Sequence, residues 1–188
     1  MTMVWITALG VGGATMIGAL LGLIFKKPRL KDFKVIIICI ILYFVWGGVA
    51  SAISNFLGFS ADANMMSEGT ITIIEPLFTL IQLVAEELFK VSVLLIAMAL
   101  IYYFTKNRKN ALVFGIFASM ILFGLIHLTA YNYNLFQCIF IIGIGSIIHL
   151  YPYIKTKNVV NSYLVHITID LSLMALMAFT QYYHYALT

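Results

Sequence analysis

The chain has 188 residues, of which 63% are hydrophobic and only 10% are charged, and its mean hydropathy is +1.04. Soluble domains carry roughly 25% charged residues, so this composition excludes a sizeable soluble domain and indicates a single membrane domain over residues 1–188. The net charge of +4 does not point to nucleic acid, because ten of the eleven basic residues lie in three short connectors between apolar runs. These connectors, at 26–34, 106–109 and 155–157, are typical of the cytoplasmic loops of an inner membrane protein.

Six apolar runs are each long enough to cross about 30 Å of hydrocarbon, which takes roughly 20 helical residues. We therefore predict an all-α integral membrane protein with about six transmembrane helices. The expected helices cover residues 4–25, 35–59, 77–104, 111–130, 135–153 and 159–183. The apolar stretch before the third helix is expected to break at Glu75-Pro76. The positive-inside rule places the three basic connectors in the cytoplasm and both termini outside the cell membrane.

The third helix carries two adjacent acids, Glu86 and Glu87, followed by Lys90. A charge at membrane depth costs at least about 2.5–3.5 kcal/mol, so these residues predict a functional site. Lys90 follows Glu86 by one helical turn and is expected to pair with it. Glu87 then needs a partner from elsewhere in the fold, or a proton. Gln82 and Glu75 share the face of Glu86 and are placed to line an aqueous approach from the outer side.

Histidines supply the other polar groups at membrane depth. His127 lies in the fourth helix, one turn after Phe123, and His166 and Asp170 share a face of the last helix at i, i+4 spacing. An Asp one turn from a His can hold the ring in one orientation. A lone buried His is usually structural, but acids and histidines on three helices together predict one shared site. His149 and His184 lie near helix ends, where interfacial positions are expected.

The depth of the site follows from counting 1.5 Å per helical residue from the basic connectors. Glu86 lies about 30 Å and His127 about 25 Å from the inner boundary, whereas His166 lies only about 12 Å from it. The last helix must therefore start below the surface, tilt or be displaced. The site is expected within the bilayer, toward the outer face.

A metal site is the first chemical alternative, because two His and an acid form a known catalytic zinc pattern. The sequence has no HExxH motif, and the ligands would have to come from three separate helices. We expect no metal and no cofactor. Ser92, Ser119 and Ser172 are ordinary helix residues and give a serine nucleophile no support.

The order of the polar motifs resembles the CAAX-protease and bacteriocin-processing family, also called the abortive-infection family of intramembrane glutamic endopeptidases. That family has a double Glu, then Phe-x-x-x-His, then His-x-x-x-Asn/Asp, and here these read Glu86-Glu87, Phe123 to His127, and His166 to Asp170. The usual form has Arg five residues after the first Glu, where this chain has Val91, with Lys90 one position earlier. The Glu-Glu-x-x-Lys form resembles a related family that cuts anti-sigma factors. Subfamily and substrate therefore stay open, with Lys90 and Phe123 as supporting residues.

The resemblance implies a mechanism. Glu86 would be the general base on a water shared with His127, and Glu87 would orient groups within the site. His166 would stabilise the oxyanion, with Asp170 orienting that ring. The implied substrate is a peptide or the end of a membrane-anchored protein, and the implied roles are peptide maturation or self-immunity to bacteriocins. No nucleic acid is expected as a partner, and the oligomeric state is unknown.

Two other functions stay open on the sequence alone. The buried acids and histidines could form the proton or ligand site of a small transporter or substrate-binding membrane subunit. A non-catalytic immunity protein could keep the motifs while binding a bacteriocin receptor. Geometry separates the first rival from a peptidase, which needs Glu86, His127 and His166 within reach of one water.

Overall fold

The computed structural model describes residue 22 and residues 25–62 and 74–187, and within these it contains helices and no strand. Five of its helices are long and apolar enough to cross a membrane, which confirms the all-α membrane fold. The expected helix over residues 4–25 lies almost wholly outside the described residues, so the sixth span stays a prediction. The elements are α3 (Leu30–Leu57), α4 (Ile74–Thr105), α5 (Arg108–Ile126), the 3₁₀ turn η2 (Leu128–Tyr131), the π-helical η3 (Gln137–Gly143), α6 (Ile144–Thr156) and α7 (Val159–Leu187).

The helix bounds differ from those expected at several places. α4 starts at Ile74, so Pro76 lies in its first turn, where the missing N–H of proline would have no helical partner in any case. α5 stops at Ile126 and His127 is its C-cap, after which Asn132 (φ 49°) and Tyr133 (φ 60°) turn the chain back. The helix expected over 135–153 is divided into η3 and α6, and α6 continues to Thr156.

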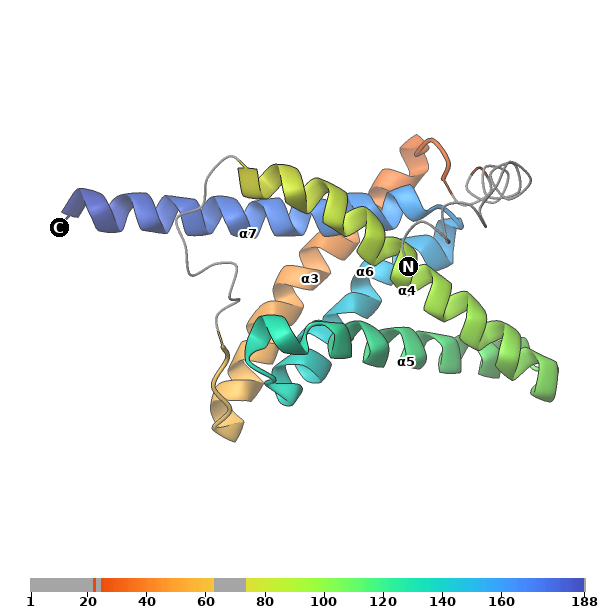
Figure 1. Cartoon of the computed structure of the whole chain (residues 1–188). Coiled ribbons are helices and arrows are strands. Elements are labelled where there is room, and N and C mark those ends of the chain that lie inside the picture. Colours follow the sequence, from red (N-terminus) through yellow and green to blue (C-terminus); the bar gives the residue numbers. More distant parts are fainter. Residues whose placement is uncertain (1–21, 23–24, 63–73, 188) are drawn as a thin grey trace, which may run out of the picture.

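The long helix α4 is shared between two neighbours (Figure 1). Its first half runs beside α7, where the Tyr163 hydroxyl donates to the Leu80 carbonyl at 3.0 Å. Its second half runs beside α5, where a Cβ added at Gly115 would come within 2.9 Å of the Leu94 carbonyl oxygen. Only glycine allows this close approach. The middle of α4, from Glu86 to Lys90, is therefore the place where α5 and α7 both come near.

Two apolar clusters lie on either side of this crossing. One joins α4, α6 and α7 through Val91, Leu150 and Val159, and the other joins α3 and α7 through Cys39 and Val165. Val91 directly follows Lys90, and Val165 directly precedes His166. The clusters thus hold the polar residues of α4 and α7 in fixed positions between them.

The polarity of the molecule is reversed relative to a soluble protein. Large apolar side chains cover the outside, including Phe78 and Ile81, which are 67% and 73% exposed. Glu87 and Lys90, in contrast, are completely buried. An apolar exterior around a charged interior suits a lipid environment, where charged groups face the helix bundle interior.

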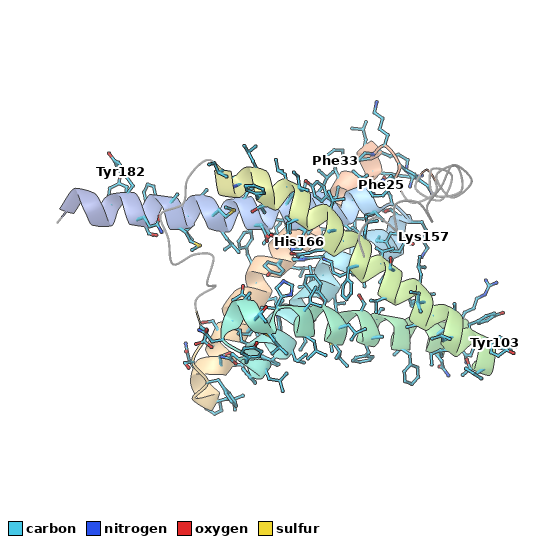
Figure 2. The ribbon with its side chains drawn as sticks, in the orientation of Figure 1. Phe25, Phe33, Tyr103, Lys157, His166 and Tyr182 are labelled. Atoms are coloured by element: carbon cyan, nitrogen blue, oxygen red, sulfur yellow. The ribbon has the colours of Figure 1, made fainter. Side chains whose placement is uncertain are left out.

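The basic connectors lie toward one side of the molecule. In Figure 2, Phe25, Phe33, Tyr103 and Lys157, which flank or belong to these connectors, lie to the right of His166, whereas Tyr182 lies at the far left. A shared side for the positive charges is what the positive-inside rule requires. The orientation across the membrane stays a prediction.

Candidate active site

Glu87 is the most enclosed acid of the site. Its Oε1 atom accepts hydrogen bonds from Lys90 Nζ at 2.5 Å and from His166 Nδ1 at 2.7 Å, and its Oε2 atom lies 2.5 Å from Ser162 Oγ. Lys90 therefore pairs with Glu87. The pair with Glu86 that the sequence predicted is not formed. Spacings of three and four residues both share a helix face, so sequence alone could not separate the two pairings. Partners on α4 and α7 make Glu87 a brace between these helices.

Lys90 is held on several sides although it carries a charge. Its Nζ atom lies 4.6 Å from the centroid of the Phe123 ring, a cation–π contact, and 3.4 Å from His166 Nδ1. Its backbone carbonyl accepts a hydrogen bond from Ser119 Oγ at 3.0 Å, which ties α5 to α4. Phe123 and Ser119 are thus the α5 residues that support the buried ion pair.

Glu86 faces a different set of groups. Its Oε1 atom accepts from Gln82 Nε2 at 2.7 Å, one turn earlier in α4. Its Oε2 atom lies 4.0 Å from His127 Nε2 and 3.9 Å from His166 Nε2, which is too long for direct hydrogen bonds. Gln82 is exposed, as expected for an approach to Glu86, while the side chain of Glu75 lies outside the described part of the structure.

The end of α5 fixes the orientation of His127. The backbone N–H of His127 bonds to the Gly124 carbonyl at 3.1 Å, and the Nδ1 atom of its ring lies 2.8 Å from the Phe123 carbonyl oxygen. A carbonyl only accepts, so Nδ1 carries the proton of the neutral ring. Nε2 then carries the lone pair, 4.0 Å from Glu86 Oε2.

His166 is oriented from α4 and from its own helix. Its Nδ1–H donates to Glu87, because a carboxylate accepts, and its Nε2 atom lies 3.8 Å from Asp170 Oδ1. Nε2 thus lies between Glu86 and Asp170. Three carboxylates and one ammonium group therefore surround this ring.

Exposure rises steadily across the site. The exposed fraction of each side chain is 0% for Glu87 and Lys90, 6% for His166, 13% for Glu86, 19% for His127 and 31% for Asp170. The accessible side therefore faces the first half of α4, the end of α5 and the later turns of α7. Gln82 lies on the same side.

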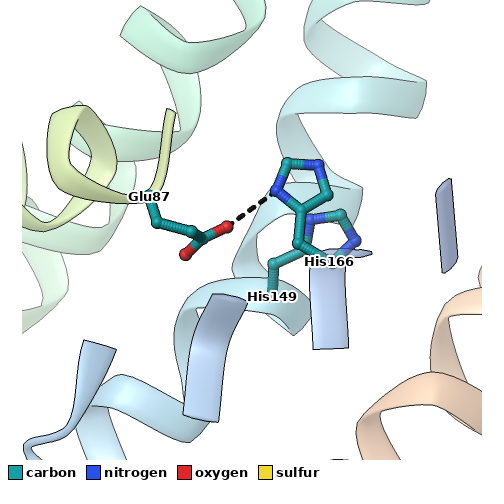
Figure 3. Close-up of side chains that lie close together, drawn as sticks. All are labelled: Glu87, His149 and His166. Carbon is teal, nitrogen blue, oxygen red and sulfur yellow. Dashed lines mark hydrogen bonds and ion pairs between the residues drawn. The ribbon is translucent and has the colours of Figure 1, made fainter. Parts of the chain in front are cut away.

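Two residues of the site were not expected. His149, assigned to an interface from its place near a helix end, is 3% exposed in α6 and lies against His166, with ring centroids 4.3 Å apart. Figure 3 shows the two rings side by side beside Glu87. Ser162 lies one turn before His166 on α7, and that spacing could have predicted it. His149 has no comparable signal, because its partners all come from other helices.

The set of Glu87, His149 and His166 is a possible metal-ligand group, since one ligand atom of each lies within 4.8 Å of the others. Its surroundings do not suit a cation. The Lys90 ammonium group lies against Glu87 and His166, and His166 Nδ1 uses its proton to bond Glu87. The rings of His149 and His166 lie against each other, with centroids 4.3 Å apart and an interplanar angle of 36°.

The fold and the site together define a multi-pass helical membrane protein with a buried acid–histidine centre. The chain belongs to the type II CAAX prenyl endopeptidase Rce1-like family, whose model matches residues 69–172, more than half of the 188-residue sequence. The matched range contains the acids and histidines of the site: Glu86, Glu87, His127, His149, His166 and Asp170. At the level of class it makes the protein an intramembrane protease. Comparison with curated proteins and with solved structures finds no match.

Proposed function

We propose that the protein is a glutamic-type intramembrane endopeptidase that uses Glu86 to activate water. The observation that carries this proposal is the position of Glu86 Oε2, 4.0 Å and 3.9 Å from the Nε2 atoms of His127 and His166. A water at ordinary hydrogen-bond distance from Glu86 can also reach either ring nitrogen across such separations. This arrangement meets the geometric requirement that distinguishes a peptidase from a transporter, which needs only a lined path.

The reaction begins when Glu86 takes a proton from this water as its oxygen attacks the scissile carbonyl carbon. His127, through its unprotonated Nε2, accepts a hydrogen bond from the water's other O–H, which stays on the attacking oxygen, and so orients the attacking lone pair. The carbonyl oxygen becomes an oxyanion and accepts a hydrogen bond from Nε2–H of cationic His166. When the C–N bond breaks, Glu86 passes its proton to the leaving amine.

The remaining polar residues prepare His166 for this role. Glu87 holds the ring through Nδ1, and Lys90 and Ser162 hold Glu87 in turn. Asp170, 3.8 Å from Nε2, favours the cationic ring and orients it. Ionised Asp170 would repel an oxyanion, so it acts through His166 and not on the substrate.

The substrate that we propose is a peptide segment of a membrane-associated protein. The family name specifies CAAX prenyl endopeptidases, so a farnesylated Cys-a-a-X peptide is the first probe, and a transmembrane-anchored peptide is the second. Bacteriocin processing or immunity stays a prediction.

The test is hydrolysis of these two quenched fluorescent peptides by the purified protein in liposomes. Wild type is expected to cut at least one, and Glu86→Gln is expected to lose about 10²–10⁴-fold in kcat, the usual contribution of general base catalysis. Thermal unfolding should be little changed, because Gln keeps the shape of Glu86 at a partly exposed position. Gln82→Ala, which removes a partner of Glu86 without removing the carboxylate, is the matched control and should retain most of the activity.

Two results would overturn the assignment. Equal hydrolysis by wild type and Glu86→Gln would exclude Glu86 as the base. Activity that is lost with a chelator and restored by zinc would instead indicate a metalloprotease.

A further inference from the structure

His149 is an unusual residue for the place it occupies. It lies in the interior of α6, and neither of its ring nitrogens has a hydrogen-bond partner among the described residues. An unpaired polar group costs roughly 1–3 kcal/mol when it is buried, so packing alone would favour an apolar residue here. The mechanism proposed above does not use its nitrogens, and a different role has to account for the ring.

The faces of the His149 ring, unlike its nitrogens, are fully used. One face lies against His166, with centroids 4.3 Å apart and an interplanar angle of 36°. The other aromatic neighbour is Tyr43 of α3, at 4.5 Å and 34°. The His149 ring thus contacts both Tyr43 of α3 and His166 of α7. The Phe123 ring makes an edge contact with His166, with centroids 6.2 Å apart.

We propose that His149 is a positioning residue for His166: its neutral ring, backed by Tyr43, fixes the plane of the His166 ring and stabilises the cationic form of that ring. This inference rests on the proposed function only in giving the cation a use. A buried imidazole without partners stays neutral, because burying an unpaired charge costs far more than burying a neutral polar group. A neutral aromatic face attracts an adjacent cation.

The charge of His166 depends on every group that faces it. These groups are Glu86, Glu87 and Lys90 from α4, Asp170 from α7, Phe123 from α5 and His149 from α6, with His127 after α5 on the other side of Glu86. The carboxylates favour the cation and Lys90 opposes it. Replacement of His149 by another uncharged residue leaves all of these charges in place, so it isolates the contribution of the aromatic face.

The experiment measures the protonation state of His166 directly. Full-length protein labelled with ¹⁵N-histidine is placed in detergent micelles, and long-range ¹⁵N–¹H spectra distinguish neutral from cationic rings at pH 7. His149→Leu is expected to lower the ratio of cationic to neutral His166 about fivefold, the scale of one cation–π contact. His149→Phe keeps an aromatic face without nitrogens and should hold the ratio near that of wild type.

Peptidase activity supplies a second readout. With the probe peptides, kcat should fall in His149→Leu while KM stays near wild type, and His149→Phe should restore kcat. If His149→Leu does not fold, Tyr43→Leu and Tyr43→Phe make the same comparison from the other side of the stack.

Three results would overturn the proposal. An unchanged His166 ratio in His149→Leu would show that the aromatic face has no role. Equal loss in His149→Phe and His149→Leu would show that the nitrogens matter instead. A shift of the His149 resonances on addition of zinc to the wild-type protein would indicate a metal ligand. The spectra need no substrate, so failure of the peptidase assignment alone would leave them interpretable.

Discussion

Lys90 is a buried cation whose charge is matched inside its own helix. Its Nζ atom lies 2.5 Å from Glu87 Oε1, and both side chains are completely buried. Loss of one partner from such a pair leaves an uncompensated charge and is more damaging than loss of both. Single-residue changes at this pair should therefore act mainly on stability, in contrast to changes at Glu86.

We expect Lys90→Met to lower the free energy of unfolding by about 3–5 kcal/mol, because Glu87 would keep its charge without the ammonium group. Lys90→Met combined with Glu87→Gln should recover part of this loss. Unfolding in mixed micelles of increasing SDS content gives the values for a double-mutant cycle. Lys109→Met, at an exposed position, is the control and should have little effect. Purely additive effects of Lys90→Met and Glu87→Gln would contradict the pairing.

Among single residues, sequence predicts those that are costly in a membrane. Glu86, Glu87, His127, His166 and Asp170 stand out because polar groups at membrane depth need a reason. Ser162 and His149 do not, since a serine is common in membrane helices and a histidine near a helix end is common at an interface. The partners of these residues are harder to predict than the residues themselves. Lys90 is equally well placed on a helix to pair with Glu86 or Glu87, and only the tertiary structure shows which pair forms.

At the scale of elements, the turn after α5 depends on close backbone approach. A Cβ added at Gly124 would collide with the Cys138 carbonyl oxygen in η3. Gly124 also accepts the backbone hydrogen bond of His127 that ends α5. A larger residue here would push η3 away from the turn that carries His127.

We expect Gly124→Ala to destabilise the protein by about 1–3 kcal/mol, the usual cost of overpacking, and to lower kcat through displacement of His127. Gly48→Ala in α3 is the matched control, because a Cβ there meets nothing within 4 Å. It should be neutral or slightly stabilising through helix propensity. Thermal unfolding gives the stability of both variants, and peptide hydrolysis gives their kcat. Similar stability and kcat in the two variants would contradict the prediction.

The side of the membrane from which the site on α4 is accessible is a second property at this scale. Gln82 and Ser92 are both exposed on α4, but Gln82 bonds Glu86 on the accessible side of the site and Ser92 lies beyond Lys90. In a background without Cys39 and Cys138, an impermeant thiol reagent applied from outside should label Gln82→Cys and miss Ser92→Cys. Labelling of Ser92→Cys alone would place the opening on the cytoplasmic side.

At the scale of the whole molecule, run length and hydropathy predict the membrane fold well, because roughly 20 apolar residues leave few alternatives. Run length and hydropathy fail where the backbone departs from a regular helix. This happens in η3 and at the C-terminal end of α5, which comes four residues earlier than expected. Counting residues also puts His166 far from Glu86 in depth, although the structure brings His166 Nδ1 to 2.7 Å from Glu87. The helices cross obliquely in Figure 1, so residue number along one helix is no measure of depth along another.

The position of the termini tests the arrangement of the whole chain. With the three basic connectors in the cytoplasm, a reporter fused after Thr188 should be active only outside the inner membrane. The same reporter fused after Lys109 would stay in the cytoplasm and should be inactive, which makes it the control. A C-terminal fusion that is active in the cytoplasm would reverse the orientation.

The pairing of Lys90 with Glu87 also bears on how the chain enters the membrane during synthesis. His166 and Ser162, the other partners of Glu87, are made some 75 or more residues after it. Until then α4 has to leave the translocon with three ionisable groups in its middle, Glu86, Glu87 and Lys90, each costing about 2.5–3.5 kcal/mol at the helix centre. Lys90 emerges only three residues after Glu87, so the two charges cancel within one turn as soon as the helix forms. Glu86 is then the one uncompensated charge in the middle of α4 before α7 arrives.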